Sequence, residues 1–500
     1  MFELHGPTPA PRFGLVTGAL ALALALILAA CSALGPDFTR PAASGPDTWS
    51  GWHAADESLL MPVDATRALS AQWWQAFNDP VLNRLEQRAL DASPDLQSAA
   101  LRFAQARVQR SVVSAQRGPE IDAGAGIDRQ RQSEYGAATR MLDLIGGNRA
   151  ALAQALSRPF TLYQAGFDAS WEPDLWGRVS RSIEAADADV DAQAALLDLA
   201  RLALASDMAR NYFELRTTQR QLGLAREDAA ALRERTEIVR ERVKAGVVEH
   251  GDLDRQQAEL AALDAQLPGL LAQEGMGINQ IALLLGEPPA SLRRELSAPI
   301  EAGPAALPDF ALGLPSEVAR RRPDILVAEA RLHRATANIG VARAELHPSI
   351  RLGAHFGYES YLGQEFGDWR SRTWSVGPSL SLPLFDRGRR KTVIVLRELE
   401  QQEAAVNYQR TVLGAWQEID DALTAYAAEL QRSEHLKDRV QRAADVYALS
   451  RARYTAGATD FIAVLDGQRS LLQARRDLVA SEGRLSAQYV AINKAIGNVR

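Results

Sequence analysis

Apolar residues recur at spacings of three and four along a proline-free stretch, residues 178–245. This period is that of an amphipathic helix, and Ala, Arg, Glu, Leu and Gln, which favour helix, dominate the stretch. We predict one helix of roughly 65 residues, about 100 Å long at 1.5 Å per residue. A helix so much longer than the usual three or four turns indicates a coiled-coil rod or one stave of a tunnel wall. The positions that carry the period are Leu215, Leu222, Ala225, Ala229, Leu232, Val239 and Val243.

The pattern returns in the C-terminal half, where a second long helix is predicted over residues 390–454. The first helix ends in Arg240-Glu-Arg-Val-Lys-Ala-Gly246, and the second ends 211 positions later in Arg451-Ala-Arg-Tyr-Thr-Ala-Gly457. Upstream, an offset of 229 positions relates Pro94, Arg102 and Pro119 to Pro323, Arg331 and Pro348. We infer that the chain contains two copies of one unit, of which the first carries 18 extra residues before Gly177.

Each unit begins with a shorter helix, predicted over residues 95–116 and 324–346, and continues through two strands into the long helix. Around residues 375–384, apolar residues alternate with small or polar ones over the length of a tilted membrane-spanning strand. The pattern alone leaves a pair of soluble hairpins as the alternative. The predicted strands cover residues 120–130 and 167–176 in the first unit, and 349–358 and 374–385 in the second.

The N-terminus has the pattern of a bacterial lipoprotein signal peptide, predicted over residues 1–30. A continuous run of small and apolar residues, 14–30, ends in Leu28-Ala-Ala-Cys31, which resembles a lipobox. Cys31 is the only cysteine, so no disulfide forms within the chain. We expect Cys31 to carry a covalent lipid; the alternative is a buried cysteine in an ordinary signal peptide. Residues 31–71 are rich in Gly, Pro, Ser and Ala and are predicted to be a lipidated tether, which the aromatic segment 72–80 docks on the body.

Composition and motifs argue against several classes of function. The net charge is −6 and the mean hydropathy is −0.18, so a helical membrane protein is not indicated. No basic cluster or aromatic platform indicates nucleic-acid binding. The sequence has no HExxH motif, no Gly-rich phosphate loop and no G-x-S-x-G elbow. We therefore expect that the protein is not an enzyme, and that it has no metal site and no cofactor apart from the lipid on Cys31.

Several motifs together resemble the outer membrane efflux protein family, and within it the lipoprotein branch of TolC-like channels of RND-type multidrug efflux systems. The resemblance covers the mature chain in order and in both repeats. The motifs are Leu34-Gly-Pro-Asp-Phe38, Trp73-Trp74 with Phe77 and Asp79-Pro80, Trp171-Glu-Pro-Asp-Leu-Trp-Gly-Arg178, Gly313-Leu-Pro-Ser316, Arg321-Arg-Pro-Asp-Ile325 and Leu382-Pro-Leu-Phe385.

The resemblance implies a mainly α fold with a membrane β-barrel: a homotrimer in which four strands per chain share a twelve-stranded barrel. A long periplasmic helical barrel and an equatorial domain complete this architecture. The first efflux repeat is expected over residues 72–285, an inter-repeat equatorial segment over 286–319 and the second repeat over 320–500. The implied function is a passive outer-membrane exit duct for small molecules, lipid-anchored and extending into the periplasm.

The resemblance also implies partners and site residues. The partners are a periplasmic adaptor and an inner-membrane pump of the RND type. Two alternative functions stay open at this point: an exit channel for type I secretion, and a periplasmic adaptor or scaffold lipoprotein. The two helix turns, at Gly246-Val247 and Gly457-Ala458, would contact the adaptor. Ile462 would form an apolar gate ring and Asp466 a cation-attracting carboxylate ring. Tyr454 would latch the closed tip, with Asp252 or Glu249 as its partner.

Overall fold

The computed structural model describes residues 33–42, 45, 49, 51, 53–61, 70–140, 142, 148–297 and 315–499. The predicted signal peptide, Cys31 and residues 298–314 of the inter-repeat segment lie outside this part. The chain divides into two compact units. The first contains Arg107–Asp189, Leu332–Glu403 and the N-terminal segment up to Thr39, and the second contains Arg40–Ala106, Val190–Arg331 and Ala404–Arg500.

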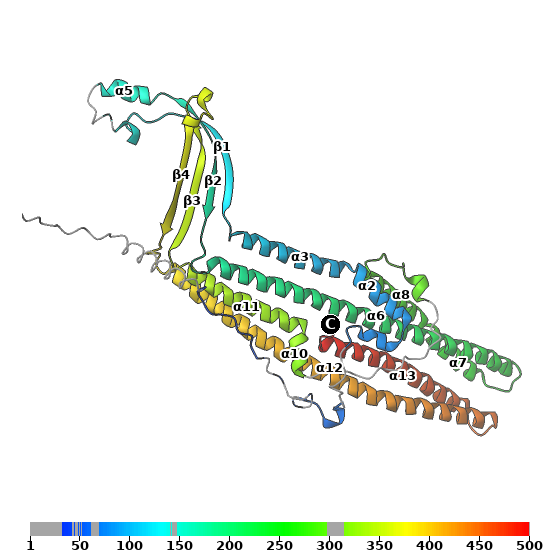
Figure 1. The fold of residues 1–500 in the computed structure, drawn as a ribbon. Coiled ribbons are helices and arrows are strands. Elements are labelled where there is room, and N and C mark those ends of the chain that lie inside the picture. Colours follow the sequence, from blue (N-terminus) through cyan, green and yellow to red (C-terminus); the bar gives the residue numbers. More distant parts are fainter. Residues whose placement is uncertain are drawn as a thin grey trace, which may run out of the picture. The chain divides into compact units, whose positions relative to one another are not determined.

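The first unit contains an antiparallel sheet of four strands in the order β1-β2-β3-β4 (Figure 1). The strands are β1 (Glu120–Gln130), β2 (Phe160–Trp171), β3 (Ser349–Ser360) and β4 (Arg372–Ser381). Two of them come from each repeat, so β2 and β3 join the repeats while β1 and β4 form the edges. The predicted positions of β1 and β3 are confirmed.

The predicted bounds of β2 and β4 were wrong at both ends. The strands begin earlier than predicted, at Phe160 instead of residue 167 and at Arg372 instead of residue 374. They also end earlier, for a reason visible in the connectors that follow them. Prediction placed β2 at residues 167–176, but it ends at Trp171, because Pro173 has no N–H for the ladder and Asp174 caps the next helix. The Asp174 carboxylate accepts hydrogen bonds from the amides of Val179 (2.9 Å) and Ser180 (2.7 Å). Likewise β4 ends at Ser381 rather than at residue 385, just before Pro383.

Both predicted long helices are confirmed. They are α6 (Arg178–Lys244) and α12 (Arg389–Thr455), and each contains 67 residues. Of the apolar positions that predicted α6, all are buried except Val243, which is half-buried. Within the part of the chain that the structure describes, no helix is both long and apolar enough to cross a membrane. The other α-helices are α2 (Pro80–Ala92), α3 (Pro94–Ala115), α5 (Arg149–Leu156), α7 (His250–Asp264), α8 (Leu267–Leu284), α9 (Arg293–Leu296), α10 (Pro315–Arg321), α11 (Pro323–Ala344) and α13 (Phe461–Ala495).

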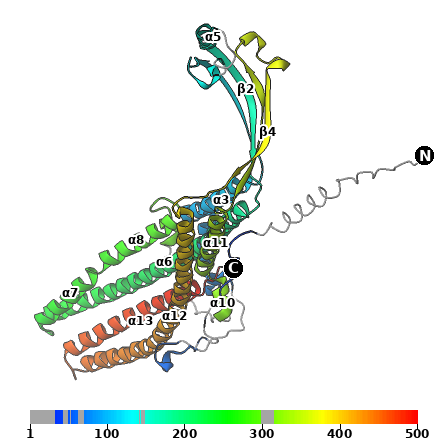
Figure 2. The ribbon, with the colours of Figure 1, turned by 90° about the vertical axis from the view of Figure 1, so that its left-hand side faces the viewer.

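The second unit holds the main hydrophobic core. In both ribbon views, α7 lies beside α6 and α13 lies beside α12 (Figures 1 and 2). The predicted docking segment is part of this core: Trp73, Trp74 and Phe77 are buried, and Phe77 packs against Tyr489 with ring centroids 5.0 Å apart. Asp79 caps α2 by accepting from the amide of Val81 at 2.9 Å. Burial of these aromatic side chains anchors the N-terminal part of the unit.

The internal repeat extends to the register of the strands. In the first repeat Glu120 pairs with Ser170, and in the second Ser349 pairs with Ser381. The offset of 229 converts Glu120 into Ser349, and the offset of 211 converts Ser170 into Ser381. The two sequence offsets therefore reproduce the pairing of one hairpin from that of the other.

Candidate functional site

The sheet has one apolar and one polar face. Large apolar side chains on one face are exposed in the single chain, far more than a water-soluble sheet normally leaves uncovered. Alternation of this kind over ten to twelve residues is typical of strands that separate lipid from an aqueous lumen. This favours membrane-spanning strands over the soluble hairpins that the sequence left open. The exposed apolar residues are Ile121, Ile127, Phe167, Trp171, Leu352, Phe356, Trp374, Val376 and Leu380.

The opposite face carries every acidic residue of the four strands, namely Glu120, Asp122, Asp128, Asp168 and Glu359. On this face His355 Nδ1 lies 2.8 Å from Asp168 Oδ1, and Gln164 Nε2 donates to Glu359 Oε2 at 3.0 Å. A hollow of ≈ 420 Å³ lies among these side chains. In the described residues, no group of three or more acidic, His or Cys side chains is arranged to hold a metal ion. The face is therefore suited to contact with water and ions.

Among the residues that the structure describes, neither edge of the sheet has a partner strand, because β1 and β4 each pair on one side only. Each edge presents a row of N–H and C=O groups that have no strand beside them. Such an edge is not tolerated in lipid, where an unsatisfied backbone group costs several kcal/mol. A sheet with this apolar face therefore requires another strand at each edge before it can enter a membrane.

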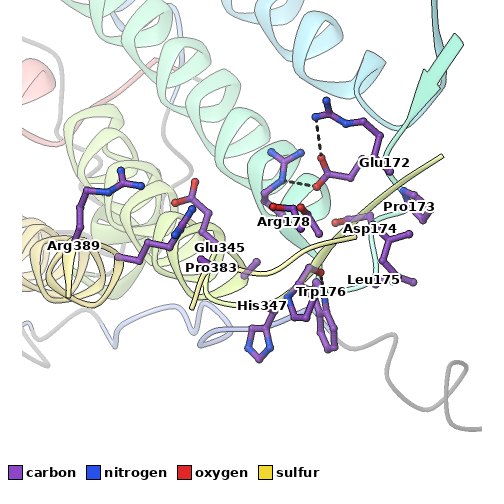
Figure 3. A pocket seen from close by; sticks show the side chains of 17 residues that line it. Glu172, Pro173, Asp174, Leu175, Trp176, Arg178, Glu345, His347, Pro383 and Arg389 are labelled. Carbon is purple, nitrogen blue, oxygen red and sulfur yellow. Dashed lines mark hydrogen bonds and ion pairs between the residues drawn. The ribbon is translucent and has the colours of Figure 1, made fainter. Parts of the chain in front are cut away.

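Short connectors turn the strands into helices around one cavity of ≈ 520 Å³ in the first unit (Figure 3). The Trp176 ring stacks on His347 with centroids 4.7 Å apart, and its Nε1 donates to the carbonyl of Pro348 at 2.7 Å. Arg178 Nε donates to Glu172 Oε1 at 3.1 Å. The two Trp176 contacts join the segment after β2 to the segment before β3, across the two repeats, and the Arg178–Glu172 contact connects the start of α6 to the segment after β2.

The segment directly after Cys31 is bound to this junction, which the sequence did not predict. Leu34 N donates to the carbonyl of Trp176 at 3.1 Å, and Arg181 binds the Asp37 carboxylate at 2.6 Å. The Arg181 side chain is only 5 % exposed. A Cβ added to Gly340 would lie 2.6 Å from the Leu34 carbonyl oxygen, so a glycine is needed there. We call residues 33–38 the N-terminal strap.

The four residues predicted to contact an adaptor lie in two matching turns at the C-terminal ends of α6 and α12. Gly246 and Gly457 adopt φ angles of 67° and 70°, in the left-handed region that favours glycine. The Val247 amide donates to the backbone carbonyl of Arg242 at 3.0 Å, and the Ala458 amide donates to the backbone carbonyl of Arg453 at 2.9 Å. These bonds are the helix-ending pattern in which an amide beyond the glycine bonds back into the last turn. All four residues are exposed, with Val247 72 % exposed.

The predicted gate residues lie on the exposed face of α13. Ile462 (44 % exposed) and Asp466 are one turn apart and both are exposed, whereas Val464 and Leu465 between them are buried. Nearby, hydrogen bonding to Glu259 and the charge of that carboxylate raise the pKa of Arg469, with a smaller contribution from Asp466. The Arg469–Glu259 ion pair, 2.6 Å long, joins α13 to α7. Asp466 itself remains available at the surface of this chain.

The predicted latch residue, Tyr454, packs on Phe461 with ring centroids 5.3 Å apart. Its hydroxyl makes no hydrogen bond to Asp252 or Glu249 in this chain, all three residues being described. Asp252 instead pairs with Arg255 at 2.8 Å. A role for Tyr454 in closing the tip stays a prediction.

The chain matches the outer membrane efflux protein family over residues 85–287 and 314–498. It is 33% identical to outer membrane protein OprJ of Pseudomonas aeruginosa over 456 residues, covering 91% of this chain and 90% of that protein. It is 28% identical to the probable outer membrane lipoprotein SilC of Salmonella typhimurium, covering 92% and 94%. Among solved structures, the outer-membrane channel OprN matches with a TM-score of 0.82 at 30% identity, covering 93% of this chain and 99% of that one.

Proposed function

The chain belongs to the outer membrane efflux protein family, and we propose that it forms the passive exit duct of a tripartite efflux pump for small molecules. It is an outer-membrane efflux protein with a TolC-like fold. The observation that carries the proposal is the two-faced sheet with two open edges, whose strands lead into helices of 67 residues. That combination suits a wall with lipid outside and water inside.

The internal repeat supplies the contact between copies. Within the chain, β2 of the first repeat pairs with β3 of the second, and Asp168 lies opposite His355. The residue equivalent to Asp168 in the second repeat is Ser379 of β4, 211 positions later, and the residue equivalent to His355 in the first repeat is Gly126 of β1, 229 positions earlier. If the contact between two copies repeats the contact between β2 and β3, Ser379 lies opposite the partner's Gly126. This register also places Leu380 opposite the partner's Ala125, so apolar residues remain on one face. The open edges of the sheet are thereby closed by copies of the same chain.

Three copies complete the ring. Four strands are too few for a closed membrane barrel, since the smallest have about eight. The family resemblance sets the number at three chains and twelve strands. The long helices of the same chains then line a conduit into the periplasm. Type I secretion of proteins is the second use of such a conduit; the efflux names of the relatives favour small molecules.

At the helix turns, the Gly246-Val247 and Gly457-Ala458 pairs form the surface for a periplasmic adaptor. In a three-fold ring Ile462 contributes an apolar constriction and Asp466 three carboxylates, which attract cations. The adaptor opens this constriction, and an inner-membrane pump of RND type supplies the energy. A cofactor is not required. The lipid expected on Cys31 anchors the chain in the membrane, and the name of the relative SilC, a probable lipoprotein, supports this anchor.

The test combines export with conductance. In a strain that lacks its own exit ducts, the full-length chain is expressed together with a periplasmic adaptor and an RND-type pump. We expect lower accumulation of a fluorescent pump substrate, and we expect the purified protein to form discrete cation-preferring channels in planar bilayers. Normal folding with neither export nor conductance would contradict the proposal. Conductance with export of a polypeptide instead of the dye would favour type I secretion.

A further inference from the structure

Only two charged side chains occupy the apolar face of the sheet, and both are arginines. In the register, Arg372 lies opposite Tyr358 and Arg129 lies opposite Thr161, so each shares its face with the exposed apolar residues. The four strands are described completely, and all five of their acidic residues are on the other face. A charge on a lipid-facing surface is destabilising by about 2–4 kcal/mol at the middle of the bilayer but by little at its boundary. These two arginines therefore mark a boundary.

Both arginines lie at the same end of the sheet, where β1 and β4 meet the loops rather than the helices. Aromatic side chains accompany them, as they do at the interfaces of membrane-spanning strands. The Arg372 guanidinium stacks over Trp369 at 4.4 Å from the ring centroid, and Trp374 is 69 % exposed. Since the helices extend from the other end into the periplasm in the proposed channel, this end faces the outer leaflet.

Arg129 and Arg372 are on opposite edge strands, so within one chain three strand spacings separate their strands, about 14 Å. The register derived from the repeat brings them onto neighbouring strands. Trp374 then lies diagonally across from the partner's Arg129 and two residues from Arg372. Diagonal neighbours on paired strands are about 7–8 Å apart, within reach of an arginine side chain. The two guanidinium groups thus converge on Trp374 only at a seam between two copies.

We propose that Arg372, Trp374 and the partner's Arg129 form a binding site, one at each subunit seam, for the phosphorylated headgroup of an outer-leaflet glycolipid of the lipid A type. This site rests on the proposed shared barrel. Arginine suits this ligand because its planar guanidinium binds phosphate oxygens in pairs. Val376, which lies directly opposite the partner's Arg129 in this register, and Leu380, four residues farther from the loops, are exposed on the same face and contact the acyl chains. The lipid bridges two copies and stabilises the seam.

The test uses the full-length lipidated protein, purified in mild detergent and mixed with bisphosphorylated lipid A, with lipid A lacking one phosphate, or with phosphatidylglycerol. Native mass spectrometry counts the lipids retained per trimer. We expect up to three molecules of bisphosphorylated lipid A, retained at least about tenfold more tightly than phosphatidylglycerol. The double variant Arg129→Gln/Arg372→Gln should lose this preference, by about the same factor.

The matched control is Arg149→Gln/Arg370→Gln. Both arginines lie in the loops that join the strands, outside the strands themselves. Arg149 is half-buried, with its guanidinium 5.3 Å from the centroid of the Tyr135 ring, and Arg370 is exposed and pairs with Asp368 at 3.3 Å. We expect the control to bind lipid A as the unchanged protein does. Equal retention by both double variants would overturn the site, and so would equal retention of phosphatidylglycerol. If the unchanged protein is not a trimer, the proposed function itself fails, and the same spectra show this before any lipid is added.

Discussion

A pair of cysteines placed across the seam tests the shared sheet at the level of single residues. The repeat offsets move the Asp168–His355 pair, whose side chains are 2.8 Å apart, onto Ser379 and the partner's Gly126. Directly opposite residues in antiparallel strands have Cα atoms about 4.5–5.5 Å apart, and a disulfide accepts roughly 4.4–6.8 Å. Ser379→Cys with Gly126→Cys should therefore link neighbouring copies. Gly126 has room for a side chain, since an added Cβ would meet only Asp128, at 3.7 Å.

The assay is non-reducing electrophoresis of outer membranes after mild oxidation. Cys31 is the only natural cysteine, so the background is low, and a Cys31→Ser version removes it entirely. We expect covalent dimers and trimers, which a reducing agent converts back to monomers. The matched control, Ser379→Cys with Gly124→Cys, shifts the pair by two residues on the same face. Its Cα atoms would be about 8 Å apart, beyond the limit of a disulfide.

The result that would refute the register is efficient linkage in the control and none in the test pair. Absence of any link between copies, while Asp168→Cys with His355→Cys forms its link within one chain, would refute the shared sheet. A slip by one residue would turn every side chain of β4 to the other face. Such a slip is recognised by linkage of Ser379→Cys to Ala125→Cys.

Three further predictions concern the gate, the core and the strap. Asp466→Ala should raise single-channel conductance or reduce cation preference in a planar bilayer, because it removes a ring of carboxylates; unchanged values would exclude Asp466 from the constriction. Burial raises the pKa of Glu86 well above 4.5, and neither of its carboxylate oxygens has a hydrogen-bond partner among the described residues. Above pH 4.5 the unfolded chain ionises first, so stability should fall by about 1.4 kcal/mol per pH unit until the folded-state pKa is reached. Thermal melting of Glu86→Gln should lack this fall, and parallel pH profiles of the two proteins would contradict it. Gly340→Val should displace the strap and speed hydrogen exchange at the Leu34 amide several-fold, while unchanged exchange would show that the strap does not need this glycine.

Local signals predicted the repeated helices and one complete strand. The period of three and four in α6 is sustained over many turns, and six of its seven marker positions are buried as expected. The ends of β2 and β4 were harder, because the alternating pattern continues past Trp171 and Ser381. There Pro173, Pro383 and the capping carboxylate of Asp174 end the pairing. A proline two residues after an alternating run is the signal that could have located both ends.

Contacts between distant residues could not be predicted from the sequence. The strap depends on Gly340, about 300 positions after Leu34, and on the buried Arg181. The burial of Glu86 was equally hidden, since its position in α2 fits an amphipathic helix with an exposed acid. The face of the sheet that carries Arg129 and Arg372 became visible only once the strand register was known. The repeat offsets could be read from the sequence, but only the observed pairing in the two hairpins showed that the same offsets relate their strand registers.

The most direct test of the channel is the native mass of the mature protein, extracted from outer membranes in mild detergent. The proposed function predicts a homotrimer of lipidated chains that needs detergent to stay in solution. A monomer that remains folded and soluble without detergent after Cys31→Ser would leave four strands unable to close a barrel. That result would contradict the exit-duct function and favour an adaptor or scaffold lipoprotein.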